Sequence, residues 1–441
     1  MPTMRGRPQF FETDPPIGRR ISIATRGQIM RALFLVAGCT ALACGLGFNA
    51  AARAAPAHRA TPAHAKSDAA FGSFIAALWP EAQARGVSRG LFDQVFQNMT
   101  PDASLLKQHT SQAEFVKPIW SYLSGAVTPQ RIATGQDMLR RYGQVLADAE
   151  RRYGVDPYVV LAIWGMETNY GQFTGGKNVV RSLATLAYGS SRREFFRNEL
   201  LIALTILQQG HISYSTMNGS WAGAMGQTQF MPSSFMKHAV DYDGDGHKNI
   251  WTSIPDAIAS TANYLAGYGW QRGMTWGYEV ILPPGFDPGL HDPQANRSFG
   301  QWASLGIHRA DGQAMPTGGE GALFLPAGMR GPAFLITPNF KVIKSYNNSQ
   351  AYALGVAVLS DRIAGAPALA AKWPTGDKPL STAQAMEIQR HLNRLGFNVG
   401  KIDGKIGEQV QTAIRAFQKH RGLTADGYAT ASLLEQVRAA R

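Results

Sequence analysis

One glutamate has the surroundings of a catalytic acid and base. Glu167 closes an apolar run over residues 159–166 that has the length and spacing of a buried helix, and it shares a face with Ile163 and Trp164. Burying a carboxyl on such a face is costly unless the group is paired, protonated or used in chemistry. On this segment alone, a helix-terminal Glu that accepts from nearby backbone donors explains the pattern equally well. The choice therefore depends on the segments that accompany Glu167.

A glycine-rich segment, GSWAGAMGQTQFMPSS, occupies residues 219–234. Glycines allow tight turns and close backbone approach, and the polar end of the segment offers hydroxyl and amide groups for hydrogen bonds. Such a segment is suited to form one wall of a sugar-binding cleft beside Glu167.

Four motifs in order resemble those of the membrane-bound lytic transglycosylase B family, which belongs to the lysozyme-like superfamily. The motifs are Glu-Thr-Asn-Tyr-Gly at 167–171, the segment 222–234, Ala-Asn-Tyr at 262–264 and Tyr-Asn-Asn-Ser at 346–349. The resemblance covers most of 70–365 and places Glu167 at the family's catalytic glutamate. The residues that it implies along the cleft are Ser220, Gln229, Tyr264, Tyr346, Asn347 and Tyr352. Core packing or turn bonding is the alternative role of these Tyr and Asn side chains.

The chemistry that the resemblance implies is cleavage of the β-1,4 bond between N-acetylmuramic acid and N-acetylglucosamine in peptidoglycan. Glu167 would first donate a proton to the bridging oxygen, while the N-acetyl group of the substrate replaces the second carboxylate of ordinary glycosidases. Glu167 would then accept the proton of the muramyl C6 hydroxyl as that oxygen closes a 1,6-anhydro ring. A hydrolytic muramidase would deliver water with the same Glu, and a non-catalytic wall-binding scaffold would not need Glu167.

A second constellation, DYDGDGHKNIWT at residues 241–252, matches much of an EF-hand calcium loop. Thr252 stands where the loop normally has a bidentate Glu, and the resemblance implies that a later Asp closes the site. The candidate ligands are Asp241, Asp243, Asp245, the backbone carbonyl of His247, and Asp256. We expect a structural calcium ion, with a solvated cluster of Asx turns as the alternative. The chemistry itself requires no cofactor.

The elements that position these residues are expected to be mostly helices. Asp156-Pro157 has the form of an N-cap followed by proline in the first turn, so a helix should begin there and end near Glu167. Further helices are expected at 192–209, 255–267 and 349–363. Short β-like runs indicate a small β-containing insertion at 274–345. The predicted fold class is mainly α (α+β), with a lysozyme-like helical catalytic domain over 67–365.

The C-terminal region is predicted to be a separate small helical domain at 381–441, joined by an Ala/Pro/Gly-rich linker at 366–380. It resembles the helical peptidoglycan-binding type through Ile388-Gln389, Asp403-Gly404, Phe417-Gln418 and Asp426-Gly427. Asp-Gly pairs make turns, so most of this signature specifies the fold rather than the contacts with a ligand. Nine Lys/Arg against five Asp/Glu give the domain a net charge of +4, which suits an anionic wall.

The N-terminus has the pattern of an export signal. Residues 1–54 contain a basic stretch, an apolar run and a small-x-small site, and a linker at 55–66 follows. The surroundings of Cys39 resemble a lipobox, which would anchor the protein in the outer membrane. The apolar run continues well past Cys39, so ordinary cleavage near Ala54 is favoured. We therefore expect a soluble protein of the periplasm.

The net charge of +13 implies an anionic partner, and +8 remains when residues 1–54 are left out. Peptidoglycan strands are the expected partner. Nucleic acid is not expected, because the chain has no recognisable nucleic-acid-binding motif and carries an export signal.

Overall fold

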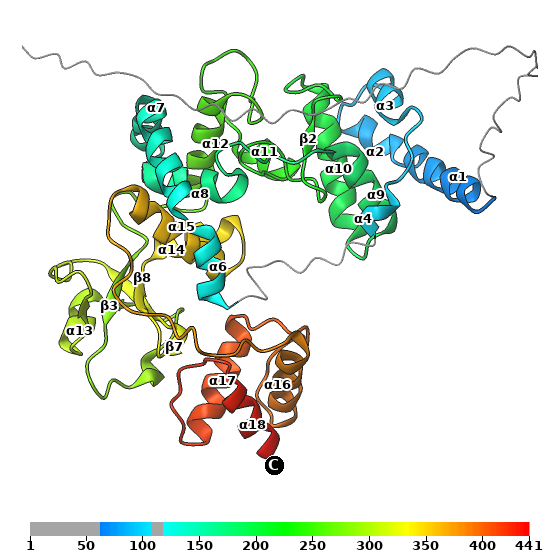
Figure 1. Cartoon of the computed structure of the whole chain (residues 1–441). Coiled ribbons are helices and arrows are strands. Elements are labelled where there is room, and N and C mark those ends of the chain that lie inside the picture. Colours follow the sequence, from blue (N-terminus) through cyan, green and yellow to red (C-terminus); the bar gives the residue numbers. More distant parts are fainter. Residues whose placement is uncertain (1–61, 107–117, 441) are drawn as a thin grey trace, which may run out of the picture. The chain divides into compact units, whose positions relative to one another are not determined.

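The computed structural model describes residues 62–106 and 118–440 (Figure 1). The predicted export signal and Cys39 lie outside the described residues. Within those two ranges, no helix combines the length and the apolar character that a membrane crossing requires. The first helix, α1 (Pro62–Ala76), begins inside the stretch expected to be linker at 55–66, where several alanines favour a helix.

The main body is helical, as the sequence predicted. Its helices are α1, α2 (Trp79–Ala84), α3 (Arg89–Phe96), α4 (Ala103–Leu106), α6 (Ile119–Ala126), α7 (Pro129–Tyr153), α8 (Pro157–Thr168), α9 (Val179–Gly189), α10 (Arg193–Gln208), α11 (Pro232–His238), α12 (Ile254–Gly267), α14 (Pro338–Tyr346) and α15 (Gln350–Ile363). Helices α8 and α15 pack against each other, with α7 and α12 beside α8. Both α8 and α15 are buried along most of their length, which explains why neither has a polar face in its sequence.

Helix α8 begins and ends where its sequence predicted. The Asp156 side chain accepts a hydrogen bond of 2.8 Å from the Tyr158 backbone N–H, and Pro157 occupies the first helical position. Asn169, at φ +50°, ends the helix in the left-handed region directly after Thr168. The chain thus turns away two residues after Glu167, which leaves that carboxyl in the last turn of a buried helix.

Strands form a small insertion and one short ribbon. The five-stranded antiparallel sheet has the order β4 (Arg297–Ser298), β6 (Glu320–Phe324), β8 (Ala333–Ile336), β3 (Gly277–Ile281), β5 (His308–Arg309). Helix α13 (Phe299–Ser304) buries Trp302 in a separate core with residues of this sheet. Strand β7 (Pro326–Met329) and the 3-10 turn Pro288–Leu290 complete the insertion. In the body, β1 (Lys177–Asn178) pairs with β2 (Asn218–Gly219).

The C-terminal domain consists of α16 (Thr382–Arg394), α17 (Glu408–His420) and α18 (Ala431–Ala439) around its own apolar core. A buried glutamine holds each Asp-Gly turn of the signature. The Gln389 side-chain oxygen accepts from the backbone N–H groups of Asp403 and Gly404, and Gln418 accepts from Gly427 and donates to the Asp426 carboxylate. These paired bonds confirm that this part of the signature specifies the fold.

The stretch expected to be a linker, 366–380, is fastened along the insertion. The Glu279 carboxylate accepts hydrogen bonds of 2.8 Å from the Ala370 and Ala371 backbone N–H groups. Leu369 and Trp373 pack against the core of the body. These contacts come from residues far away in the sequence, so the composition of 366–380 could not predict them. The segment is held along the body as an ordered strap.

The C-terminal domain is also tied directly to the insertion. Buried His291 uses both ring nitrogens: Nε2 accepts from the Leu325 backbone N–H at 3.2 Å, and Nδ1 donates to the Asp426 carbonyl at 3.1 Å. Burial lowers the pKa of His291 to about 4, so the neutral ring that this pattern requires prevails at neutral pH. The Asp426 carboxylate accepts from the Met329 backbone N–H at 3.3 Å. Polar contacts of this kind fix the orientation of the domain on strand β7.

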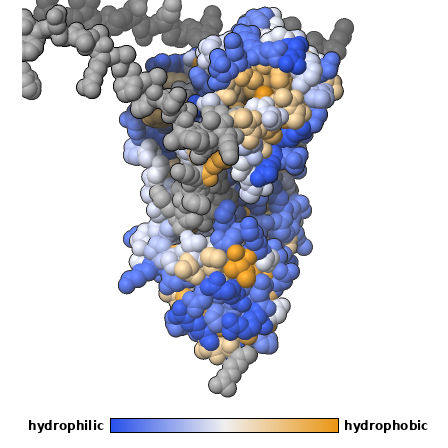
Figure 2. Space-filling model, turned by 90° about the vertical axis from the view of Figure 1, so that its right-hand side faces the viewer, coloured by the Kyte–Doolittle hydropathy of each residue, from blue (hydrophilic) through white to orange (hydrophobic). Residues whose placement is uncertain are grey.

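The surface is mostly hydrophilic on the face drawn in Figure 2, where hydrophobic colour gathers in small areas. Among the described residues, few large hydrophobic side chains are exposed, and Phe173 is the most exposed at 71%. A hydrophilic surface agrees with a polar polymer as partner.

Candidate active site

The carboxyl of Glu167 is held by a tyrosine from a distant part of the chain. Tyr352, on the first turn of α15, donates from its hydroxyl to Glu167 Oε1 at 2.6 Å. Burial raises the pKa of Tyr352 well above its usual range, and the nearby charge of Glu167 adds to that shift. Tyr352 therefore keeps its proton at any physiological pH. It acts as a permanent donor that sets the orientation of the carboxyl.

Gln227 joins the glycine-rich segment to α8. Its side-chain oxygen accepts from the Trp164 indole N–H at 2.7 Å, and its amide donates to the Trp251 carbonyl at 3.3 Å. Its backbone carbonyl accepts from the Thr168 hydroxyl at 3.1 Å. These bonds reach α8 on both sides of Glu167. Gln227 is not among the residues predicted along the cleft, although it lies within the motif at 222–234.

Gln229 and Ser220 have structural bonds within the same segment. The Gln229 amide donates to the carbonyls of Thr174 at 3.1 Å and Gly226 at 2.9 Å, with φ at +50°. Ser220 Oγ accepts from the backbone N–H groups of Ala222 and Ala224. The Ser220 hydroxyl can still donate its proton to a ligand. The side-chain oxygen of Gln229 can still accept a hydrogen bond from one.

The loop after α8 lies directly against this segment. Gly175, at φ +92°, approaches so closely that a Cβ added there would lie 2.1 Å from the Gly219 carbonyl oxygen. Only glycine fits this contact, which connects the loop following Glu167 to the start of the glycine-rich wall.

Tyr264 and Tyr346 pack against each other beside the glycine-rich segment. Their ring centroids are 4.7 Å apart, and the Tyr346 hydroxyl donates to the Thr228 carbonyl at 2.7 Å. The Tyr264 hydroxyl donates to the Ser345 carbonyl at 2.8 Å. Burial raises the pKa of both phenols, and the charge of Glu167 contributes in each case. Both rings therefore lie near Glu167. Their ring packing and their hydrogen bonds to backbone carbonyls also agree with the alternative prediction, in which these tyrosines have a structural role in the core.

The structure thus brings the predicted residues together. Tyr352 is hydrogen-bonded to Glu167, and the charge of Glu167 contributes to the raised pKa of Tyr346 and of Tyr264. Tyr346 is bonded to Thr228 of the glycine-rich segment, and Asn347 caps the C-terminus of α14 before the start of α15. Contact of these side chains with a substrate stays a prediction. The arrangement offers one carboxyl oriented by a phenol donor, which suits proton transfer in both directions.

A cluster of carboxylates lies at the predicted calcium loop. Ligand oxygens of Asp241, Asp243 and Asp256 all lie within 4.8 Å of one another. Asp256, on the first turn of α12, is buried and accepts from the backbone N–H groups of Tyr242 at 2.9 Å and Asn249 at 2.7 Å. Burial raises the pKa of Asp256, and backbone donors oppose that shift only in part. The later acid implied by the family resemblance is therefore brought to the loop.

Asp245 and His247 are placed differently from these three. Asp245 Oδ1 accepts from the His247 backbone N–H at 2.7 Å and is not part of the carboxylate group. The His247 side chain is exposed, in line with a contribution from its backbone carbonyl alone.

Comparison with known proteins defines the class. Residues 70–361 match the family described as Transglycosylase SLT domain, and residues 381–437 match the Putative peptidoglycan binding domain. Because the first match covers more than half of the chain, the chain belongs to the transglycosylase SLT domain family, a lysozyme-like fold, and is a lytic transglycosylase of peptidoglycan. The predicted family, fold class and enzyme class are confirmed.

Individual relatives agree with this class. Membrane-bound lytic murein transglycosylase B of Escherichia coli (strain K12) is 34% identical over 252 residues, which make up 55% of this chain and 66% of that protein. SltB3 from Pseudomonas aeruginosa, solved with NAG-anhNAM-pentapeptide, is 46% identical with a TM-score of 0.79, covering 84% of this chain and 99% of SltB3. Escherichia coli Slt35, solved with calcium, is 30% identical with a TM-score of 0.57, covering 67% of this chain and 93% of Slt35.

Replacing Tyr352 with phenylalanine should lower turnover roughly ten- to a hundredfold, because a hydrogen bond to a charged group is lost. A carboxyl without that donor holds its proton more tightly, so the alkaline limb of the pH–rate profile should move to higher pH. Steady-state rates on purified peptidoglycan across pH measure both effects. Tyr188→Phe, on a ring packed against Phe71, is the control. An unchanged pH profile in Tyr352→Phe would contradict the role of the phenol.

Proposed function

We propose that this enzyme cleaves the β-1,4 bond between N-acetylmuramic acid and N-acetylglucosamine, with Glu167 as acid and then base. The observation that carries the proposal is the carboxyl of Glu167, placed in the last turn of buried α8 and oriented by the Tyr352 hydroxyl. One relative, SltB3, has been solved with two sugar–pentapeptide fragments, which supports peptidoglycan as the substrate.

The first step breaks the glycosidic bond. Protonated Glu167 gives its proton to the bridging oxygen, the muramyl C1–O bond breaks, and the N-acetylglucosamine side leaves with a hydroxyl at C4. The carbonyl oxygen of the muramyl N-acetyl group stabilises the positive charge that develops at C1, as in substrate-assisted glycosidases. No second protein carboxylate is required.

The second step closes the ring. Glu167, now a carboxylate, accepts the proton of the muramyl C6 hydroxyl while that oxygen forms a bond to C1. The product is a 1,6-anhydro-muramyl end, and Glu167 is again protonated. Water is not consumed. Ser220 and Gln229 are proposed to hold the sugars by hydrogen bonds at the glycine-rich wall, and Tyr346, Asn347 and Tyr264 to complete the cleft.

Mass analysis of sugar products from digested peptidoglycan tests the proposal. Every new muramyl end should be an anhydro-muramyl group, which has the mass of the reducing sugar less one water. Reducing muramyl ends alone would identify a hydrolytic muramidase that uses the same Glu.

We propose that the enzyme works in the periplasm, since its substrate lies there and residues 1–54 have an export pattern. Cell fractionation with detection of the native chain tests this location. Cleavage near Ala54 gives a released protein, whereas radiolabelled lipid on Cys39 would identify an anchored one.

We also propose a structural calcium ion at Asp241, Asp243 and Asp256, supported by their close grouping and by the calcium complex of Slt35. Calcium should raise the melting temperature, by a stabilisation of about 2.7 kcal/mol at a hundredfold excess over Kd. Because burial raises the pKa of Asp256, the proton competes with calcium, and the gain should grow as pH rises through that pKa.

Thermal unfolding in calcium and in chelator measures this gain. Asp241→Asn combined with Asp243→Asn should abolish it. His247→Ala is the matched control inside the loop and should keep it, because only the backbone carbonyl of His247 is a ligand. Identical melting curves in calcium and chelator would leave the loop as a cluster of turns.

A further inference from the structure

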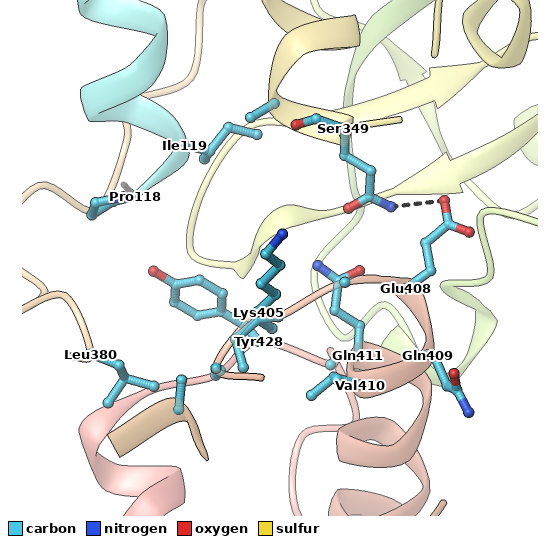
Figure 3. Close-up of a pocket in the computed structure, with 18 of the residues that line it drawn as sticks. Pro118, Ile119, Ser349, Leu380, Lys405, Glu408, Gln409, Val410, Gln411 and Tyr428 are labelled. Carbon is cyan, nitrogen blue, oxygen red and sulfur yellow. Dashed lines mark hydrogen bonds between the residues drawn. The ribbon is translucent and has the colours of Figure 1, made fainter. Parts of the chain in front are cut away.

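A pocket of about 500 Å³ lies between the catalytic body and the C-terminal domain (Figure 3). We call it the interdomain pocket. The body contributes the start of α6 at Pro118 and Ile119 and the junction before α15 at Ser349. The C-terminal domain contributes Lys405 with its loop, the first turn of α17, and Tyr428. None of these residues takes part in the proton transfer proposed for Glu167.

The loop that carries two of the lining lysines is held in place. Gln389 is fully buried, and its amide donates to the backbone carbonyls of Lys405 at 3.1 Å and Lys401 at 3.4 Å. Its oxygen accepts from the turn between those lysines. Figure 3 shows the Lys405 side chain beside Tyr428 and directed toward the side of the pocket on which Ile119 and Ser349 lie. Because the backbone of this loop is already held, a ligand that binds its lysines does not have to order the loop itself.

The described residues of the pocket lining carry an excess of positive charge. Its lining includes the lysines Lys344, Lys378, Lys401 and Lys405 and the acids Asp403 and Glu408. Glu408 is already engaged, because its carboxylate forms an ion pair with Lys344 and accepts from the Gln350 amide at 3.3 Å. Among the described lining residues, four lysines stand against two acids, and this balance favours an anionic ligand that has more than one carboxylate.

Small apolar surfaces alternate with these charges. Pro118, Ile119, Leu380 and Val410 line the pocket beside the lysines. This mixture suits a peptide with carboxylates and short aliphatic side chains. It suits a bare glycan less well, because sugars are usually bound on flat aromatic faces. Among the described lining residues, only Trp120 and Tyr428 are aromatic.

The pocket and the candidate active site share the first turn of α15. Ser349 lines the pocket and caps α15, since its Oγ accepts from the Tyr352 backbone N–H at 3.3 Å. The Tyr352 hydroxyl in turn donates to Glu167. A ligand in the pocket would therefore contact the same turn that orients the catalytic carboxyl.

We propose that the interdomain pocket binds the carboxylate-bearing peptide attached to the muramyl residues of the glycan strand. This proposal rests on the proposed function, because the peptide reaches the pocket on the same polymer that the cleft cleaves. Lys401 and Lys405 bind peptide carboxylates, and the apolar lining accepts its methyl groups. The pocket thereby makes the enzyme prefer strands that still carry peptides.

Calorimetric titration of the full-length Glu167→Gln protein tests the proposal without turnover. The probes are a defined muramyl-containing tetrasaccharide with pentapeptides and the same tetrasaccharide without peptide. The peptide-bearing probe should bind more tightly. Lys401→Ala combined with Lys405→Ala should weaken its binding roughly tenfold and leave the bare probe unchanged. Lys401→Arg with Lys405→Arg should restore binding.

The matched control is Lys419→Ala with Arg421→Ala, which removes the same charge from the same domain outside the pocket and should change neither affinity. Equal affinity of the parent for both probes would overturn the proposal. So would an unchanged peptide-bearing affinity in the alanine pair, or an equal loss for both probes, which would assign the pocket to glycan. Product analysis on the unmodified enzyme reports the cleavage chemistry separately, so failure of one proposal does not imply failure of the other.

Discussion

Replacement of Glu167 by glutamine should reduce peptidoglycan turnover at least about a thousandfold, within the range that general acid–base groups supply. The effect should be large because one carboxyl serves both steps: the amide cannot donate the proton that breaks the glycosidic bond or accept the one from the C6 hydroxyl. Release of soluble muropeptides from purified sacculi, followed over time, measures this loss.

The fold should survive this change. The glutamine oxygen can still accept the hydrogen bond from Tyr352, and the side chain keeps its volume in the last turn of α8. The melting temperature should therefore stay close to that of the parent. Glu150→Gln, at an exposed position of α7, is the matched control and should keep full activity. Near-parental release of muropeptides by Glu167→Gln would refute the assignment of Glu167.

The sequence predicted that Glu167 lies near the end of a buried helix because the signals there are local. An Asp-Pro start and an unbroken apolar run specify α8, and both are properties of neighbouring residues. The same holds for the Asp-Gly turns of the C-terminal domain, where each turn is bonded by a helix glutamine of the same small domain.

Partners far apart in the chain could not be predicted in this way. The Tyr352 hydroxyl meets Glu167 across 185 positions because α15 packs on α8. Gln227 reaches Trp164 across 63 positions. Family resemblance placed Tyr352 near the cleft, but the hydrogen bond that orients the carboxyl depends on helix packing, which no local pattern encodes.

The segment 366–380 shows most clearly that amino-acid composition alone does not predict whether a linker is ordered. Ala, Pro and Gly predicted a flexible spacer, yet Glu279 bonds two backbone N–H groups of this segment from strand β3. The Glu279 carboxylate, 91 positions from its first partner, acts together with the packing of Leu369 and Trp373 to hold the segment on the body. This difference changes what removal of the C-terminal domain should do.

Deletion of residues 381–441 should impair the cleft itself as well as binding to the wall. A flexibly tethered domain would leave cleavage of short soluble fragments unchanged. Here the domain contacts the elements that carry the site: Glu408 pairs with Lys344 on α14 and accepts from Gln350 on the first turn of α15. Without Glu408, the last turn of α14, with Tyr346, loses this ion pair, and the first turn of α15, with Tyr352, loses this hydrogen bond.

The deletion also leaves buried polar groups without partners. His291 loses its acceptor at the Asp426 carbonyl, and the Met329 N–H loses the Asp426 carboxylate. Each lost partner costs roughly 1–3 kcal/mol where the group stays away from water. Thermal unfolding should therefore begin several degrees lower in the truncated protein, at roughly the shift expected for a few kcal/mol in a chain of this size.

The pH dependence of docking has a defined sign. The pKa of His291 falls from an ordinary value near 6.5 to about 4 in the docked state, so docking favours the neutral ring. The stabilisation is fully present above pH 6.5 and is lost as pH falls from there towards 4. The difference in melting temperature between full-length and truncated protein should shrink over that window.

Two measurements together decide how the domain acts. Truncated enzyme should cleave soluble peptide-bearing fragments roughly tenfold more slowly, and it should also sediment less with insoluble sacculi. Lys344→Ala keeps the domain but removes its ion pair with α14, so it should reproduce part of the loss on soluble fragments, whereas Lys341→Ala at an exposed position of the same helix should not. If truncation weakens sedimentation but leaves the melting temperature and the soluble-fragment rate unchanged, the domain is a tether and its contacts with the body do not support catalysis.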